Sequence, residues 1–271
     1  MLLEGQFRKL KNGKTIHYAS LGQGPPLFFL HGYPDQLQVW YQLAPLLAQN
    51  FQCIALDWPG MGKSDAWQGG ATPFHMAKNL EQIIDDWGFS QVSLLAHDMG
   101  AQPAAIFASQ NPQRMERLFL MNFLAFHNLE TSWEIEILRN FGWNRFIIEK
   151  LPIGVYWRAL NTFVPSQFPI EKEIKENIWE DFKKKPARKF ISKMCAGYQA
   201  TLNKLPGYYA KIQCPTHVLW GEKDKHFPVI QGEKLKSVIP KCRYNIIDGG
   251  EHWMVIHKAK EVYQFILEGL K

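Results

Sequence analysis

The segment 92–101, Val-Ser-Leu-Leu-Ala-His-Asp-Met-Gly-Ala, constrains the fold of this chain more than any other. A short apolar run ends close to an aspartate, Asp98, and then passes into a stretch with helical character. Ala96, Gly100 and Ala101 are small, because a larger side chain would collide where the backbone reverses direction sharply. The segment therefore predicts a sharp turn from a buried strand into a helix, with the Asp98 side chain lifted out of the end of a sheet.

Short apolar runs alternate with longer stretches of helical periodicity along most of the chain. Two alternating runs around Asn12-Gly13 predict a β-hairpin over 6–21, because Asn-Gly is a favoured hairpin turn. Strands that alternate with helices form a parallel sheet covered by helices on both faces. The sequence thus predicts an α/β fold with a doubly wound, mostly parallel, eight-stranded sheet. The other strands are expected at 27–30, 51–56, 91–96, 117–122, 216–220 and 243–247, and helices at 39–49, 74–87, 99–110, 229–238 and 259–270.

The alternation of strands and helices stops between residues 124 and 209. Trp, Phe, Lys and Glu recur there at helical spacing, and no strand is predicted. Such an insertion is expected to lie over the carboxyl ends of the strands, where open α/β sheets bind ligands. We predict a core domain formed by 1–123 and 210–271, and a helical cap domain formed by 124–209.

The charge distribution argues against a nucleic-acid or membrane partner. The net charge is +6, but the basic residues are spread along the chain, and the densest run, 183–189, follows Glu180 and Asp181. This mixture is typical of a solvated helix face. The expected partner is a small-molecule substrate, with the chain as a monomer or homodimer.

Cysteine spacing and hydropathy indicate a cytoplasmic protein. The four cysteines show no Cys-x-x-Cys spacing, so we expect reduced thiols. The sequence has neither an apolar stretch of about 18 residues, which a membrane helix requires, nor an N-terminal leader pattern. The cysteines are Cys53, Cys195, Cys214 and Cys242.

Three more motifs accompany Asp98, and each follows a predicted strand. They are the segment His31-Gly32-Tyr33-Pro34, the loop aspartate Asp224 and the loop histidine His252. Because parallel strands present their carboxyl ends at one edge of a sheet, these groups are expected to meet there. The order nucleophile, acid, histidine along the chain is typical of hydrolases whose nucleophile sits on a strand–turn–helix elbow.

With these motifs the chain resembles the α/β-hydrolase superfamily over nearly its whole length. Within it, the chain is similar to the branch with an aspartate nucleophile: epoxide hydrolases, haloalkane dehalogenases and haloacetate dehalogenases. The His-Gly-Tyr-Pro segment resembles the HGxP loop of epoxide hydrolases. The resemblance implies Asp98, Asp224 and His252 as catalytic residues, the backbone N–H groups of Tyr33 and Met99 as the oxyanion hole, and no cofactor.

An aspartate at the elbow selects a particular chemistry. A carboxylate reacts poorly with amide carbonyls but can displace a leaving group from an sp³ carbon, which forms an alkyl ester on Asp98. His252 would then act as general base on a water that attacks the ester. Asp224 would orient His252 and stabilise its charged form.

The residues beside Asp98 favour an epoxide over a halide. Haloalkane dehalogenases usually place Trp directly after the nucleophile and a second Trp or Asn in the oxyanion loop, where this chain has Met99 and Tyr33. Haloacetate dehalogenases typically have Arg after the nucleophile. An epoxide opens to an alkoxide and needs an acid, which two cap tyrosines supply in epoxide hydrolases. A tyrosine with a pKa of about 10 can donate that proton.

The cap offers several candidates for the substrate pocket. Tyr198 matches the second of these tyrosines by its position late in the cap. The first is ambiguous between Tyr156 and Arg158, because aligning Pro165 with the proline that commonly follows this segment puts Arg158 at the donor position. An arginine there could bind a carboxylate or halide. Further candidates for the pocket wall are Trp253, Trp40 and Trp157.

Three alternatives to epoxide hydrolysis stay open. The first is a haloalkane or haloacetate dehalogenase with a halide site supplied by the cap, and the second is another Asp98-ester reaction such as lactone opening. The third is a non-catalytic protein that binds a small apolar ligand, which would not need Asp224 and His252 at their positions. The remaining histidines form no pair with the spacing of a metal site, so no metal is expected.

Overall fold

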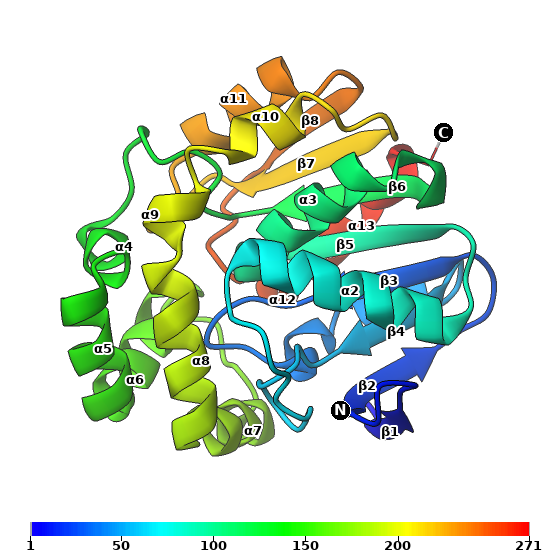
Figure 1. Cartoon of the computed structure of the whole chain (residues 1–271). Coiled ribbons are helices and arrows are strands. Elements are labelled where there is room, and N and C mark those ends of the chain that lie inside the picture. Colours follow the sequence, from blue (N-terminus) through cyan, green and yellow to red (C-terminus); the bar gives the residue numbers. More distant parts are fainter. Residues whose placement is uncertain (1, 271) are drawn as a thin grey trace.

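A single eight-stranded sheet runs through the protein (Figure 1). The computed structural model describes residues 2–270, without the side chains of residues 141 and 199, so the outermost residues of the predicted core domain lie outside the described residues. The strand order is β1-β2-β4-β3-β5-β6-β7-β8. β2 pairs antiparallel with β1 and β4, and the other neighbours are parallel. The predicted fold class is confirmed. The strands are β1 Gln6–Lys9, β2 Thr15–Leu21, β3 Pro26–Leu30, β4 Gln52–Leu56, β5 Val92–His97, β6 Met115–Met121, β7 Thr216–Gly221 and β8 Cys242–Ile247.

The central strands β3 and β5 explain where the site forms. Every residue of β5 is buried, as are Leu27 to Leu30 of β3, and such continuous apolar runs are typical of parallel strands covered on both faces. The register pairs Leu30 with Ala96. The loop after β3 and the turn after β5 therefore begin side by side at the same edge of the sheet.

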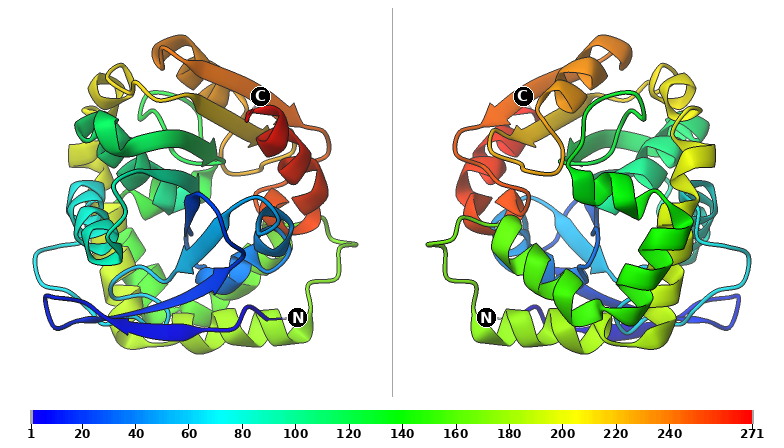
Figure 2. Two further views of the ribbon diagram at one scale, coloured as in Figure 1. Left: turned by 90° about the vertical axis from the view of Figure 1, so that its right-hand side faces the viewer. Right: turned by 90° about the vertical axis from the view of Figure 1, so that its left-hand side faces the viewer.

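Helices cover both faces of the sheet. Figure 2 shows α2 and α3 on one side and α1 with α13 on the other. These helices bury the apolar faces that the sequence pattern predicts for them. The helices of this group are α1 Ala44–Leu47, α2 Pro73–Trp87, α3 Ala101–Gln110, α11 Ile230–Val238, α12 Met254–His257 and α13 Ala259–Glu268, with 3₁₀ turns η1 Leu37–Trp40, η2 Asp98–Gly100 and η3 Pro112–Arg114.

The segment between β6 and β7 is helical, and we call its helices the cap helices. In Figure 1 they stand beside the carboxyl end of β7, and α4, α5 and α6 face the viewer in the right-hand view of Figure 2. α5 packs on α8, where the Ser192 hydroxyl donates to Asn144 Oδ1 at 3.1 Å. The cap helices are α4 Trp133–Leu138, α5 Phe141–Lys150, α6 Pro152–Thr162, α7 Lys172–Phe182, α8 Lys185–Ala196, α9 Tyr198–Thr201 and α10 Leu205–Tyr209.

Two predicted helices differ from the observed ones near the site. The helix expected at 39–49 is split into η1 and α1, and Pro45, which has no N–H to donate, lies in the first turn of α1. The helix expected at 99–110 begins instead as the 3₁₀ turn η2, and the α-helix α3 starts only at Ala101.

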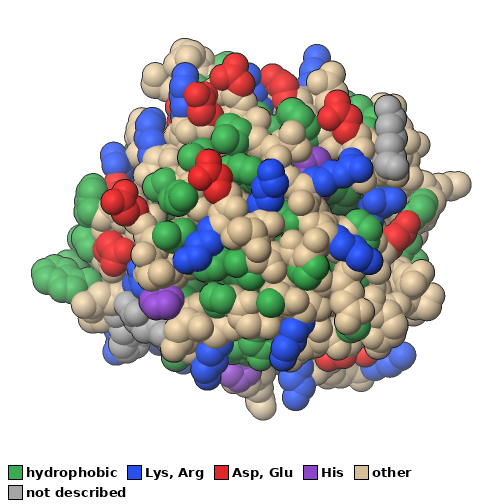
Figure 3. Space-filling view, turned by 90° about the horizontal axis from the view of Figure 1, so that it is seen from above, with side chains coloured by type: hydrophobic (Ala, Val, Ile, Leu, Met, Phe, Trp, Pro, Cys, Tyr) green, Lys and Arg blue, Asp and Glu red, His purple; other side chains and the backbone are tan. Residues whose placement is uncertain are grey.

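The surface mixes charged and apolar groups. On the face shown in Figure 3, basic and acidic side chains are interspersed, and hydrophobic side chains protrude at the left edge, on the side of the cap helices. Trp133, Trp143 and Trp157 of these helices are each more than half exposed. Among the described residues, no helix combines the length and apolarity that crossing a bilayer requires.

Candidate active site

The turn after β5 holds Asp98 in a strained backbone conformation. Its φ of 48° lies in the left-handed region, which non-glycine residues rarely adopt. Two glycines, one in this turn and one in the loop after β3, allow the two segments to approach each other closely. A β-carbon on Gly100 would lie 2.4 Å from the carbonyl oxygen of Leu30, and one on Gly32 would lie 2.4 Å from Cβ of Asp98. The sequence thus brings the loop after β3 into direct contact with the Asp98 side chain.

Two backbone N–H groups stabilise the Asp98 carboxylate. The N–H of Tyr33 donates to Oδ2 at 2.8 Å, and the N–H of Met99 also hydrogen-bonds to the carboxylate. Burial raises the pKa of Asp98, and the charge of His252 together with these two hydrogen bonds opposes that rise. The amides predicted from sequence as the oxyanion hole are therefore the ones that contact the predicted nucleophile.

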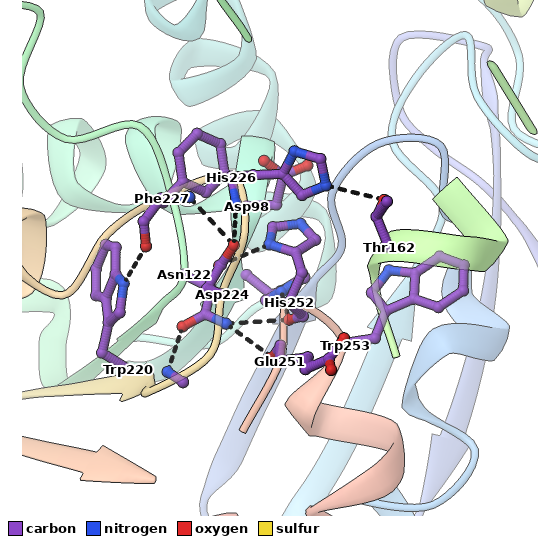
Figure 4. A network of polar contacts seen from close by, with 12 residues as sticks. Asp98, Asn122, Thr162, Trp220, Asp224, His226, Phe227, Glu251, His252 and Trp253 are labelled. Carbon is purple, nitrogen blue, oxygen red and sulfur yellow. Dashed lines mark hydrogen bonds and ion pairs between the residues drawn. The ribbon is translucent and has the colours of Figure 1, made fainter. Parts of the chain in front are cut away.

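His252 and Asp224 form a buried pair next to Asp98 (Figure 4). His252 Nδ1 donates to Asp224 Oδ2 at 2.9 Å. The other oxygen of Asp224 accepts from the N–H of His226 at 2.8 Å and of Phe227 at 3.1 Å. Because Nδ1 is occupied as a donor, Nε2 of His252 is free to accept a proton when the ring is neutral.

Electrostatics favour a charged form of this pair. Burial lowers the pKa of His252, but the carboxylate of Asp224 outweighs burial and raises it above its ordinary value. Burial likewise raises the pKa of Asp224, and the hydrogen-bonded histidine outweighs it and leaves the pKa lowered. Asp224 therefore stays ionised and stabilises the imidazolium that a base forms when it takes a proton from water.

Two side chains that the sequence analysis did not select hold the backbone of His252. Asn122, at a φ of 40°, donates from Nδ2 to the carbonyl oxygens of Glu251 and His252 at 3.2 and 3.1 Å (Figure 4). Its Oδ1 accepts from the N–H of Gly221 at 2.8 Å. His97 donates from Nε2 to the carbonyl oxygen of His252 at 2.8 Å. The one signal for Asn122 is its type, because asparagine is the residue most often found at positive φ apart from glycine.

The sequence analysis also did not select Asp35, a buried side chain close enough to His252 for the two charges to interact. It is 3% exposed, and neither carboxyl oxygen accepts a well-formed hydrogen bond from the described residues, although the Trp253 side chain and the Gly32 backbone lie close enough to oppose the rise in its pKa. Burial, reinforced by the negative charge of Asp98, raises the pKa of Asp35 to about 8. Nδ1 of His97 lies 3.9 Å from Oδ2, and burial lowers the pKa of His97 to about 3, so that ring is neutral. Asp35 is thus held as a neutral acid at pH 7.

Asp35→Asn is expected to become increasingly stabilising, relative to the wild type, as the pH rises. Because the folded pKa lies above the unfolded value of about 4, ionisation opposes folding. The penalty is absent below pH about 4, grows through the interval up to pH 8, and is constant above it. The difference in free energy of unfolding should widen by about 1 kcal/mol per pH unit between pH 5 and 7. Urea unfolding at several pH values measures it, with the exposed Asp248→Asn as control, and a constant difference would contradict the assignment.

A cavity opens between Asp98 and the cap helices. It has a volume of about 120 Å³ and an almost entirely apolar wall. Asp98, His252 and Tyr33 line its floor from the core, and Tyr198 lines it from the cap. Apolar side chains from the cap complete the wall, among them Leu138, Val155 and Met194. The cavity therefore suits a small apolar substrate, with its polar groups concentrated at the floor.

Four of the predicted pocket residues do not line this cavity, and the expectation for them is corrected. The Tyr156 hydroxyl donates to the carbonyl oxygen of Lys175 at 2.6 Å, so it faces α7. Trp157 is 58% exposed and points to the outside of α6. The rings of Trp40 and Trp253 are fully buried and pack against Phe29 and Phe163, respectively. Periodicity places Tyr156, Trp157 and Trp40 on helices but does not say which face of a helix meets the core, and Trp253 lies in a loop to which no periodicity applies.

Arg158 lines the cavity but is already paired. Its guanidinium hydrogen-bonds to Oε1 of Glu134, and the side chain is 54% exposed. Because Glu134 neutralises it, Arg158 offers no free charge for a substrate carboxylate. In the described part of the chain, no group of three or more His, Cys, Asp or Glu side chains is placed to hold a metal ion.

Comparison with known proteins places the chain in a family. A family model described as the alpha/beta hydrolase fold matches residues 25–259. The chain belongs to the α/β-hydrolase fold family. A solved structure of a membrane phospholipase A has a TM-score of 0.86 at 22% identity, covering 99% of this chain and 86% of that one. At this identity the likeness shows the fold alone.

Two curated relatives of this α/β-hydrolase have different names. A soluble epoxide hydrolase from Corynebacterium sp. (strain C12) is 34% identical over 113 residues, which span 42% of this chain and 40% of that protein. A 2-hydroxy-6-oxononadienedioate/2-hydroxy-6-oxononatrienedioate hydrolase from Pseudomonas putida is 25% identical over 98% of this chain and 96% of its own length. Because the two names imply different substrates, the choice between them for this chain depends on the residues of its own site.

Proposed function

We propose that this α/β-hydrolase opens epoxides to vicinal diols through an alkyl ester on Asp98. The observation behind the proposal is the carboxylate at the elbow, which accepts hydrogen bonds from the N–H groups of Tyr33 and Met99. A carboxylate in this place attacks an sp³ carbon rather than a carbonyl. The buried pair of His252 and Asp224 supplies the base that the second step needs.

The first step forms the ester. A carboxylate oxygen of Asp98 attacks a ring carbon of the epoxide, the C–O bond of the ring breaks, and its electron pair moves to the ring oxygen. That oxygen becomes an alkoxide and takes a proton from a tyrosine hydroxyl in the cavity wall, for which Tyr198 is the cap candidate. The product of this step is a hydroxyalkyl ester of Asp98.

The second step hydrolyses the ester. Nε2 of His252 takes a proton from water while the water oxygen attacks Cγ of Asp98. The tetrahedral oxyanion is stabilised by the N–H groups of Tyr33 and Met99, which already point at this carboxylate. The intermediate collapses as the bond from Cγ to the alkyl oxygen breaks, and the imidazolium of His252 returns its proton to that oxygen. The diol leaves with Asp98 as a carboxylic acid. Asp98 then loses its proton to solvent, which restores the carboxylate and balances the proton that the tyrosinate of the first step takes up.

The cavity wall favours an epoxide over a halide as substrate. A halide leaves as a stable anion and needs N–H donors around it, but among the described lining residues the only indole is Trp133, which is 65% exposed. Arg158 is neutralised by Glu134. An epoxide oxygen needs an O–H donor, which tyrosines provide. The name of the Corynebacterium relative supports the same choice.

Mass measurement on the His252→Gln variant tests this proposal, because the ester should accumulate when its hydrolysis is blocked. The variant is incubated with 1,2-epoxyhexane and, separately, with 1-bromohexane. We expect a gain equal to the whole mass of the epoxide, located at Asp98 by peptide mapping, and no adduct from the bromide.

Two controls complete the experiment. The exposed His127→Gln variant should accumulate no adduct, and His252→Gln combined with Asp98→Ala should remain unlabelled. A gain of the hexyl group from the bromide alone would replace the epoxide by a halide as substrate. An absence of any adduct would contradict the ester mechanism and favour the small-ligand-binding alternative.

A further inference from the structure

Tyr33 lines the cavity, and its hydroxyl is a polar group to which the site described so far gives no role. Tyr33 is 7% exposed, and its hydroxyl oxygen is buried and has no hydrogen-bond partner among the described residues. A buried hydroxyl left unpaired costs free energy, because it has lost its hydrogen bonds to water without gaining others. A bound ligand with an acceptor oxygen would remove this cost. The role of the Tyr33 N–H in the oxyanion hole does not explain why the hydroxyl of the same residue is buried in this place.

The position of Tyr33 is fixed at both ends. Its N–H donates to Asp98 Oδ2 at 2.8 Å, which anchors the backbone at the carboxylate. Its ring packs edge-on against Phe182 of α7, with ring centroids 5.7 Å apart. The ring thus spans the distance from Asp98 to the cap and lines the cavity along the way. A side chain held in this manner presents its hydroxyl with little loss of conformational freedom.

Tyr33 and Tyr198 share one environment. Both line the cavity, and burial raises the pKa of both hydroxyls, with further increases from Cys195 and Asp98. Both hydroxyls therefore stay protonated and able to donate. Tyr156, by contrast, already donates to Lys175. The chain thus offers the cavity one hydroxyl from the cap and a second one from the loop after β3.

We propose that the hydroxyl of Tyr33 acts with that of Tyr198 as proton donor to the leaving oxygen, which rests on the epoxide chemistry proposed above. As the ring C–O bond breaks, its electron pair stays on oxygen, and that oxygen takes the phenolic proton of one tyrosine while the other donates a hydrogen bond. The tyrosinate regains a proton from water before the next turnover. Tyr33 then serves both steps: its hydroxyl in ester formation and its N–H in ester hydrolysis.

Tyr33→Phe separates the two roles, because it removes the hydroxyl and keeps the N–H. In the His252→Gln background, the rate of adduct formation with 1,2-epoxyhexane, followed by intact mass, is expected to fall about 10²-fold. Tyr41→Phe in the same background is the matched control, since Tyr41 is 5% exposed and does not line the cavity, and its rate should not change. With His252 present, the breakdown of preformed ester in Tyr33→Phe should match the wild type.

The possible outcomes are distinguishable. An unchanged rate of adduct formation in Tyr33→Phe, with a large loss in Tyr198→Phe, would leave Tyr198 as the sole donor and overturn the assignment. Equal slowing of ester formation and ester breakdown, with a lowered melting temperature, would show a structural role instead. An absence of adduct in the parent His252→Gln protein would overturn the epoxide function and, with it, this role of Tyr33.

Discussion

Asp98→Ala is expected to lower kcat/KM for epoxide opening by about 10⁴-fold or more. Without the carboxylate there is no nucleophile to form the ester, and His252 alone has no ester to hydrolyse. Folding should be retained. Burial raises the pKa of Asp98, which means that the folded state disfavours the ionised carboxylate, and removal of that group relieves this unfavourable contribution. Alanine at a φ of 48° is itself strained, so the two effects oppose one another.

Steady-state kinetics and thermal unfolding together test this expectation. The control is Asp248→Ala, a variant of an exposed aspartate in the same loop as His252, which should keep its activity. A melting temperature close to that of the wild type, with turnover lost, would support Asp98 as the nucleophile. Retained turnover in a folded Asp98→Ala protein would rule out the ester mechanism, whatever the substrate.

The elements that meet at the sheet edge could be predicted from sequence because each has a local cause. The turn at Asp98 needs small neighbours, and Gly100 approaches the carbonyl oxygen of Leu30 too closely for any β-carbon. The continuous apolar run of β5 reports that both faces are covered. Strand order then brings Asp98, Asp224 and His252 to one edge without further information.

Two features could not be predicted in the same way: the partners of the cap side chains, and the side chains that hold the catalytic residues in place. Helical periodicity places Tyr156 and Arg158 on one helix, but the partner that each side chain finds belongs to another helix: Lys175 for the first and Glu134 for the second. Asn122 acts through a hydrogen bond to a loop distant in sequence. Asp35 is distinguished by being buried without a well-formed hydrogen bond. Such arrangements depend on tertiary packing, which a single sequence pattern does not specify.

Asp224→Asn is expected to slow ester hydrolysis by about 10³- to 10⁴-fold while ester formation continues. Oδ1 of Asp224 accepts from two backbone N–H groups, those of His226 and Phe227. The amide oxygen of the variant must occupy that place, because an NH₂ group there would face two donors. The NH₂ group then takes the place of Oδ2, which lies 2.9 Å from Nδ1 of His252 in the wild type. It is therefore directed at that nitrogen.

This reversal changes the tautomer of His252. Nδ1 must accept from the amide, so the ring proton moves to Nε2, which can no longer take a proton from water. Ester should therefore accumulate on Asp98 during turnover, visible by intact mass in a protein that still has His252. The exposed Asp248→Asn variant should accumulate none.

The pH dependence of ester breakdown gives a second measure of the same contact. Although burial lowers it, the pKa of His252 is raised above its usual 6.5 by Asp224. Hydrolysis in the wild type should therefore fall as the pH drops through a value above 6.5, since the protonated ring is no base. Loss of the charge in Asp224→Asn should move this decline to lower pH. If both steps slowed equally and the profile stayed in place, Asp224 would be stabilising the loop rather than directing the proton on His252, and the base in the second step would have to be sought elsewhere.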